Sequence, residues 1–262
     1  MEKRFQIVTD SSCDLPQALA DELDLAVLPL HVLIGEHTYA NYLDGREIGF
    51  REFYDKLRDG ERATTSAVNV SEFTAVMEEK LKAGLDVLFI GFSSGLSTTY
   101  QSGAIACGEL REKYPERKLV VIDSLCSSSG YGLLVDGAAD LRDEGRSMDE
   151  IADWVLEKRQ KVHHQFYSTE LKFYRRSGRM SGAAAAIGTV LGICPIMRLD
   201  DKGRIIAYDK VRGKKNAVAR TVETMKRHAE NGENYTGKAF ICHSNCLADA
   251  EATKAAVEAA FP

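Results

Sequence analysis

The sequence lacks any uninterrupted run of about 18 apolar residues, the length that a bilayer-spanning helix needs. Its nearest approach, Ala183 to Ile196, is shorter and contains Gly188, Thr189 and Gly192. The first residues also lack the apolar segment of a signal peptide, because polar side chains interrupt it. We therefore expect a cytoplasmic protein with no stable membrane insertion.

An excess of positive charge is also missing. The chain carries 34 Lys and Arg against 39 Asp and Glu, a formal net charge of −5, so no overall field attracts phosphate backbones, and we expect no nucleic acid partner. Otherwise the 262 residues, 44% of them hydrophobic, have the composition of a globular protein with room for one large or two smaller domains.

Nucleotide and zinc motifs are absent as well. No G-x-x-x-x-G-K-S/T loop occurs, and no G-x-G-x-x-G follows a predicted strand. Cys242, His243 and Cys246 lie close in sequence, but no second pair at zinc spacing accompanies them. A metal site there is the less favoured interpretation; we expect buried, reduced thiols at a strand end, and no cofactor.

What the sequence does contain is an alternation of short apolar runs with longer amphipathic segments. It predicts strands over residues 5–8, 87–92 and 119–122, and helices over 17–23, 99–113, about 130–144 and 147–161. Strand, turn and helix in repetition indicate a parallel sheet covered by helices on both faces. We expect an N-terminal three-layer α/β domain over residues 1–160.

The second part has a different pattern. Two candidate strands, 193–199 and 205–211, are joined by the hairpin signal Asp200 to Gly203. A helix over 216–231, a strand over 239–242 and a helix over 248–260 follow. These elements predict a mixed-sheet α/β domain over residues 161–262.

Hydroxyl groups fill the turns after the three predicted strands of the first domain. In an open parallel sheet, ligands bind at the carboxyl ends of the strands, beside helix N-termini that favour anions. The serines there can therefore hold a carboxylate or phosphate, or they can simply cap helices. They are Ser11, Ser12, Ser93, Ser94, Ser97 and Ser127 to Ser129.

One of these turns also matches a catalytic motif. Gly91-Phe92-Ser93-Ser94-Gly95 satisfies G-x-S-x-G between a strand and a helix, as in a nucleophile elbow. Ser93 would then need a histidine base, and His163, His164, His228 and His243 follow it in the chain. A serine hydrolase, either an esterase or a thioesterase, is the alternative function.

Several short blocks recur in a characteristic order along the chain: residues 9–16, 65–66, 93–102, 123–124, 130–132, 171–181, 187–196 and 201–203. Taken together and in this order, they resemble the signature segments of the DegV family of bacterial fatty-acid-binding proteins. The similarity covers nearly the whole chain.

This resemblance implies two α/β domains with one long-chain fatty acid, such as palmitate, stearate or oleate, buried in a tunnel between them. It implies that Thr65 and either Ser93 or Ser94 hold the carboxylate. We expect Ser11, Ser97, Ser127 and Arg179 to be additional pocket residues.

The resemblance further implies that the protein is a carrier and not an enzyme. The bound acid would be presented to the catalytic subunit of a fatty acid kinase, which phosphorylates its carboxylate. A concentration of arginines in an acidic chain suits such a docking face, and for this role we expect Arg198, Arg204 and Arg212.

Two further expectations concern the C-terminal domain. Ala183 to Gly188 forms a helix with small residues on every face, along which a neighbouring helix or an acyl chain can lie. Family members continue into a block with His-Thr-Gly-Pro-Gly character, whereas this sequence ends at Pro262. We therefore expect this domain to be truncated relative to the family.

Overall fold

A computed structural model describes residues 5–180 and 192–261, and it divides into two compact units, Met1–Val162 and His163–Pro262. The segment Ala183 to Gly188, for which we predict a helix of small residues, lies outside the described residues.

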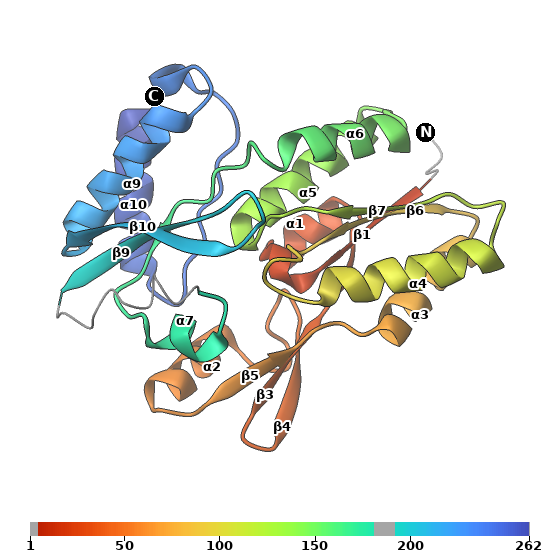
Figure 1. The fold of residues 1–262 in the computed structure, drawn as a ribbon, viewed down its shortest axis with the longest axis horizontal. Coiled ribbons are helices and arrows are strands. Elements are labelled where there is room, and N and C mark those ends of the chain that lie inside the picture. The colour runs from red at the N-terminus through yellow and green to blue at the C-terminus, as the bar shows by residue number, and fades with distance from the viewer. Residues whose placement is uncertain (1–4, 181–191, 262) are drawn as a thin grey trace. The chain divides into compact units, whose positions relative to one another are not determined.

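The first unit is built on a four-stranded sheet (Figure 1). Its strands, in spatial order, are β2 (Ala26–Leu28), β1 (Phe5–Asp10), β6 (Asp86–Gly91) and β7 (Leu119–Asp123). Every neighbouring pair is parallel. All six residues of β1 are buried, as expected for a parallel strand covered on both faces. The predicted parallel sheet is confirmed.

Helices cover both faces of this sheet (Figure 1). One face carries α3 (Val70–Lys82) and α4 (Thr99–Lys113), and the other carries α1 (Gln17–Glu22), α5 (Ser128–Asp143) and α6 (Met148–Lys158). On the first face Phe73 and Met77 of α3 and Cys107 of α4 pack against Phe89 of β6 in a fully buried cluster. Both α3 and α6 begin with a capping box, including the predicted pair Ser147 and Glu150.

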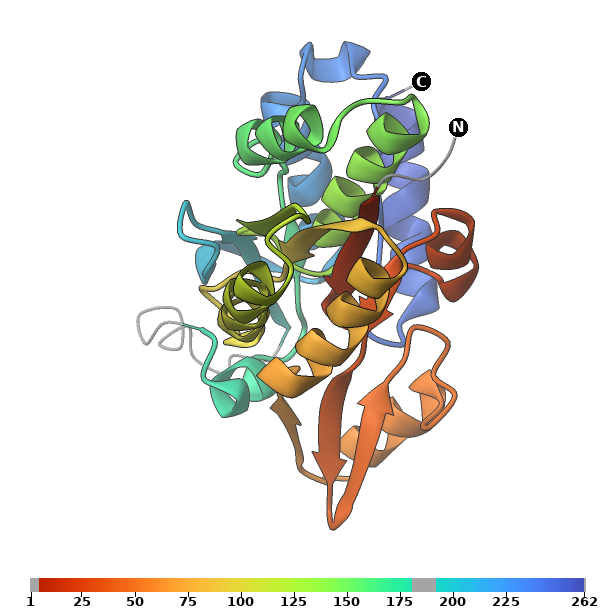
Figure 2. The same ribbon diagram turned by 90° about the vertical axis from the view of Figure 1, so that its right-hand side faces the viewer.

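A second sheet in this unit was not predicted from the sequence. It is antiparallel and consists of β4 (His37–Asn41), β3 (Leu30–Ile34) and β5 (Ala63–Ser66), with β3 in the centre (Figure 2). A small core of Val32, Ile34 and Ile48 supports it, together with Phe53 from α2 (Phe50–Arg58). Its outer strands are largely exposed, so they carry little of the apolar alternation by which strands are recognised.

The second unit contains a three-stranded antiparallel sheet of β8 (Phe166–Tyr167), β9 (Ile193–Leu199) and β10 (Ile205–Arg212). The predicted hairpin is confirmed. Cys194 and Ile196 of β9 pack against Ala217 of α9 (Lys214–His228), while Met197 on the opposite face packs against Leu171. The other helices are α7 (Lys172–Ser177) and α10 (Leu247–Ala260).

The strand predicted over residues 239–242 was wrong, because this segment has no strand conformation and pairs with no strand in the described part of the chain. A strand is stable only when a neighbour satisfies its backbone groups, and Ile241 is 45% exposed. The expected burial of Cys242 and Cys246 was wrong for the same reason, since both thiols are exposed.

Candidate carboxylate-binding site

The serine-bearing turns follow three adjacent parallel strands. Because β1, β6 and β7 are neighbours and run in the same direction, their carboxyl ends lie at one edge of the sheet. The turn after β1 contains Ser11, the turn after β6 contains Ser93, Ser94 and Ser97, and the turn after β7 leads to Ser127. We call this edge, with its three turns, the strand-end site.

Asp10, the last residue of β1, ties two of these turns together. Its side chain is fully buried, and its carboxylate accepts the backbone N–H groups of Ser12 at 3.0 Å and Phe92 at 3.2 Å. Burial raises the pKa of Asp10 above its ordinary value, and these hydrogen bonds only partly offset that effect.

Tyr131 of α5 anchors the same edge from the helical layer. Its buried hydroxyl donates to the carbonyl oxygen of Ile90 at 2.6 Å, lies 3.2 Å from the Asp10 carboxylate and makes a further hydrogen bond with the hydroxyl of Thr9. One phenol of α5 therefore connects β1, through Thr9 and Asp10, with β6, through Ile90.

Asp123, the last residue of β7, fixes the turn after β6. Its carboxylate accepts the N–H of Ser94 at 3.1 Å and the N–H of Leu125 at 3.1 Å. The backbone carbonyl of Asp123 accepts a hydrogen bond from Nη1 of Arg159, which follows α6, at 2.8 Å. The two aspartates thus occupy N–H groups that a ligand would otherwise use.

Ser93 does not have the geometry of a nucleophile elbow. Its side chain is fully buried, its Oγ accepts the N–H of Gly95 at 3.2 Å, and its own N–H donates to the carbonyl of Cys126 at 3.1 Å. An elbow serine is strained and exposed, but Ser93 is not among the described residues with positive φ. The hydrogen bonds of Ser93 hold the backbone of this turn.

Ser94 differs from the serine beside it. It is half-buried, and its Oγ makes no hydrogen bond to any residue that the structure describes. Its N–H is held by Asp123, which fixes the position of the residue. Ser94 is therefore the serine of the β6 turn whose hydroxyl is available for a ligand.

The other predicted pocket serines are used mainly within the fold. Ser11 Oγ accepts the N–H of Leu30 at 3.0 Å and the side-chain amide of Asn41 at 3.3 Å, which joins the end of β1 to the second sheet. Ser97 Oγ accepts the N–H of Thr99 at 3.2 Å at the start of α4. Ser127 is the N-cap residue of α5, although its side chain makes no capping bond.

Thr65 lies on β5, paired with Val32 of β3, and is exposed. No hydrogen bond between described residues joins Thr65 to Ser93 or Ser94. The segment that follows Thr65 is fixed by Glu72, whose carboxylate accepts the N–H of Asn69 and contacts the His31 ring at 2.7 Å.

The four predicted arginines lie in the second unit, and the structure does not bring them together. Arg198 is on the face of the hairpin that packs against α9, whereas Arg212, opposite Ile193, is on the other face. Arg204 pairs with Asp200 at 2.8 Å within the hairpin turn, and Arg179 donates to the carbonyl of Ser177 at 2.6 Å. Successive side chains of a strand point to opposite faces of the sheet, so arginines that are close in sequence are separated in the fold.

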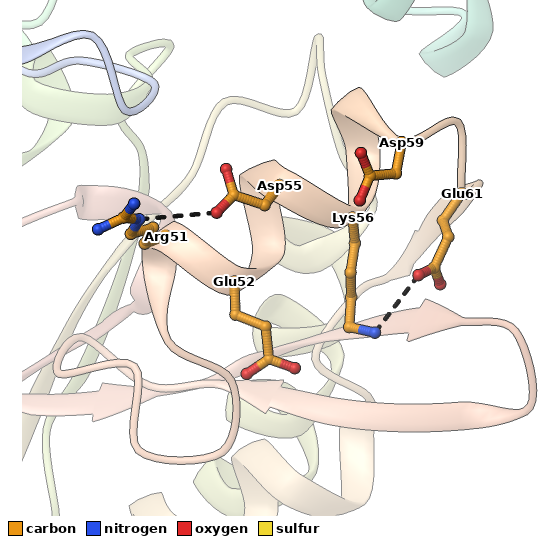
Figure 3. Close-up of a pocket in the computed structure, with 6 residues that line it drawn as sticks. All are labelled: Arg51, Glu52, Asp55, Lys56, Asp59 and Glu61. Atoms are coloured by element: carbon orange, nitrogen blue, oxygen red, sulfur yellow. Dashed lines mark hydrogen bonds and ion pairs between the residues drawn. The ribbon is translucent and has the colours of Figure 1, made fainter.

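A hollow beside α2 is unsuited to an acyl chain. All six side chains that line it are charged, and ion pairs join two pairs of them (Figure 3). An apolar chain gains nothing by leaving water for such a surface. The lining residues are Arg51, Glu52, Asp55, Lys56, Asp59 and Glu61.

The residues that the structure describes contain neither a metal-type cluster nor a membrane-spanning helix. No group of three or more His, Cys, Asp or Glu side chains in ranges 5–180 and 192–261 has the arrangement of a metal site. Within the same ranges, no helix is both long and apolar enough to cross a bilayer.

Sequence reasoning missed the residues that support the strand-end site, namely Asp10, Asp123, Tyr131 and Arg159. A signal for the two aspartates was present, because each ends a buried strand directly before a serine. The roles of Tyr131 and Arg159 depend on contacts between distant elements.

Comparisons with known proteins agree with this architecture. A family model described as "Uncharacterised protein, DegV family" matches residues 4–262. A DegV domain-containing protein of Clostridium perfringens is 37% identical over 260 residues, covering 99% of this chain and 88% of the relative.

Solved structures give the same result. A DegV family protein from Thermus thermophilus, described for its fatty acid binding, is 34% identical, with a TM-score of 0.77 over 87% of this chain and 78% of that one. DegV of Bacillus subtilis, a fatty acid binding protein, is 27% identical, with a TM-score of 0.81 over 100% and 90%. This chain therefore belongs to the DegV family.

Proposed function

We propose that this protein binds one long-chain fatty acid, such as palmitate, stearate or oleate, with the carboxylate at the strand-end site. The observation that carries the proposal is the half-buried Ser94 hydroxyl, held at the carboxyl edge of a parallel sheet without a partner among the described residues. The fatty acid binding of the Thermus thermophilus relative supports the ligand class.

Ser94 and Thr65 are the proposed donors to the carboxylate. A hydroxyl that donates to a carboxylate forms a charge-assisted hydrogen bond, which is about twice as strong as a neutral one. The acyl chain supplies most of the binding energy, because each buried methylene contributes about 0.8 kcal/mol. The hydroxyls therefore position the head group. Ser93 supports Ser94 through the turn.

We also propose that the bound acid is presented to the catalytic subunit of a fatty acid kinase, which converts it to an acyl phosphate. Exposed Arg198 and Arg212 remain candidate contacts, but they would have to engage different surfaces of the partner because they lie on opposite faces of the hairpin. Arg204 contributes less charge, since Asp200 pairs with it.

Native mass spectrometry of the purified protein, followed by solvent extraction, tests the lipid proposal. We expect about one fatty acid per chain, as expected for a single buried site. Protein that is empty and also ignores added palmitate and oleate would overturn it. Fluorophosphonate labelling that Ser93→Ala abolishes would instead favour the hydrolase.

The kinase proposal has a separate test. The lipid-loaded protein is mixed with a fatty acid kinase catalytic subunit and ATP, and hydroxylamine is added to trap acyl phosphate as a hydroxamate. Hydroxamate should form only when both proteins are present. Equal formation with free fatty acid alone would show that presentation by this protein is not required.

A further inference from the structure

Arg159 holds a positive charge at the carboxyl end of β7, which is part of the strand-end site. It follows α6, and its Nη1 donates to the backbone carbonyl of Asp123 at 2.8 Å. The carboxylate of the same Asp123 holds the N–H of Ser94 at 3.1 Å. Asp123 therefore links Arg159 to the serine proposed to meet the ligand.

Tyr100, in the first turn of α4, is a further residue at this edge of the sheet. Its ring lies over Gly91 at the end of β6. Burial raises the pKa of this half-buried phenol, the charge of Asp123 raises it further, and the charge of Arg159 lowers it.

The negative charge of Asp123 affects which ligands the strand-end site can favour. A ligand carboxylate at Ser94 lies beside the carboxylate of Asp123, and like charges at close range repel. A serine hydroxyl does not distinguish the two kinds of ligand, because it can donate to a fatty acid and to a neutral fatty alcohol alike. A nearby positive charge favours the ionised ligand over the neutral one.

We propose that Arg159 is a specificity-determining positioning residue, which makes the strand-end site prefer an ionised fatty acid to a neutral lipid of the same chain length. This inference rests on the proposed function. Arg159 acts through Asp123: its hydrogen bond to the backbone carbonyl at the end of β7 holds the guanidinium charge beside the residue that fixes Ser94. The Nε of Arg159 is buried and has no partner among described residues, so the guanidinium occupies its position without being fully hydrogen-bonded.

The fold contains a matched control for this residue. Arg111 of α4 donates from Nε and Nη2 to the carbonyl of Leu119, at 3.2 and 2.8 Å. Leu119 is the first residue of β7 and Asp123 is the last. Two guanidinium groups thus bind carbonyls at opposite ends of one strand, and only Arg159 is at the strand-end site.

The test is a competition between palmitate and hexadecan-1-ol for the delipidated full chain, with each bound lipid quantified after extraction. We expect the wild type to prefer palmitate and Arg159→Gln to lower the palmitate-to-alcohol ratio about tenfold, the effect of losing one partly screened charge. Arg159→Lys should retain most of the preference, and Arg111→Gln should leave the ratio unchanged.

Two results with these variants would overturn the inference: an unchanged ratio in Arg159→Gln, or an equal loss of both lipids, which indicates a purely structural role. Should Arg159→Gln fail to fold, the wild-type ratio is compared between about 0.05 M and 0.5 M salt, where a preference based on charge must shrink. A ratio that salt does not alter would also overturn it. Wild-type protein that binds neither lipid contradicts the proposed function instead.

Discussion

The carboxylate of Asp123 accepts the backbone N–H of Ser94 at 3.1 Å, so the end of one strand fixes the turn that follows its neighbour. Asp10 makes the equivalent contact with Phe92 at 3.2 Å from the strand on the other side. The β6 turn is therefore held from both sides by acceptors that belong to the scaffold.

Removing the Asp123 acceptor should loosen this turn. Asp123→Ala leaves the N–H groups of Ser94 and Leu125 without their acceptor, and we expect a loss of about 1 to 3 kcal/mol in the free energy of unfolding, measured by urea denaturation. Asp86→Ala is the control, because among the described residues the Asp86 side chain accepts only the exposed N–H of Lys118, at the opposite end of the sheet. Equal losses of unfolding free energy in the two variants would show that the Asp123 contact with the turn stabilises the protein no more than an exposed hydrogen bond does.

The lipid contacts are tested by removing one hydroxyl at a time. Ser94→Ala and Thr65→Ala should each weaken fatty acid binding by about 1 to 3 kcal/mol, through loss of a charge-assisted hydrogen bond. Displacement of a fluorescent fatty acid measures the change. Thr98→Ala, an exposed residue in the same connection to α4, should bind as the wild type does. Unchanged affinity in both site variants would remove the proposed carboxylate contacts.

Gly132 allows α5 to pack closely against the turn after β1, because it has no Cβ. A Cβ at Gly132 would lie 2.4 Å from the backbone oxygen of Cys13, so we expect Gly132→Ala to destabilise the protein by about 1 to 3 kcal/mol. A Cβ at Gly108 of α4 meets nothing within 4 Å, and Gly108→Ala should stabilise it by about 0.5 to 1 kcal/mol. Thermal unfolding of both variants measures these opposite shifts; shifts of the same sign would contradict the close approach.

Asp10 should make folding sensitive to pH. Because burial raises its folded-state pKa above the unfolded value, the native state binds the proton more tightly, and stability is lost as pH rises from about 4 through the folded value. Asp10→Asn removes this titration, so the stability difference from the wild type should vary with pH over that window. Urea denaturation at a series of pH values measures it.

Glu78 supplies a control of opposite sign. Hydrogen bonds from Lys113, Lys82 and Tyr114 lower its pKa to about 2, so its contribution is present above its unfolded pKa and is lost as pH falls toward 2. Glu78→Gln should therefore flatten the acid side of the profile. A constant stability difference in Asp10→Asn across the pH series would show that Asp10 does not titrate differently in the folded state.

Local sequence patterns predicted the amphipathic helices, the hairpin and the strands that are short apolar runs. The helix Thr99–Lys113 has the predicted bounds, and the hairpin of β9 and β10 has the predicted position. The antiparallel sheet around β3 was missed because its outer strands are exposed, and the apolar run at 239–242 was overinterpreted because nothing in the sequence tells whether a partner strand exists.

The candidate site shows the same limit at the level of single hydroxyls. The sequence placed Ser93, Ser94 and Ser97 together but could not distinguish them, because their hydrogen bonds depend on the folded turn. Ser93 Oγ accepts from Gly95 and Ser97 Oγ accepts from Thr99, whereas the contact that holds Ser94 uses its backbone N–H and comes from Asp123, 29 residues away.

The aspartates at the ends of β1 and β7 have an evolutionary consequence. They hold the β6 turn by its main chain, and every amino acid except proline supplies the same N–H group. The residue at position 94 can therefore be exchanged for one with a different side chain while its backbone stays in place. If position 94 meets the ligand as we propose, ligand preference can change at this position without requiring a new fold.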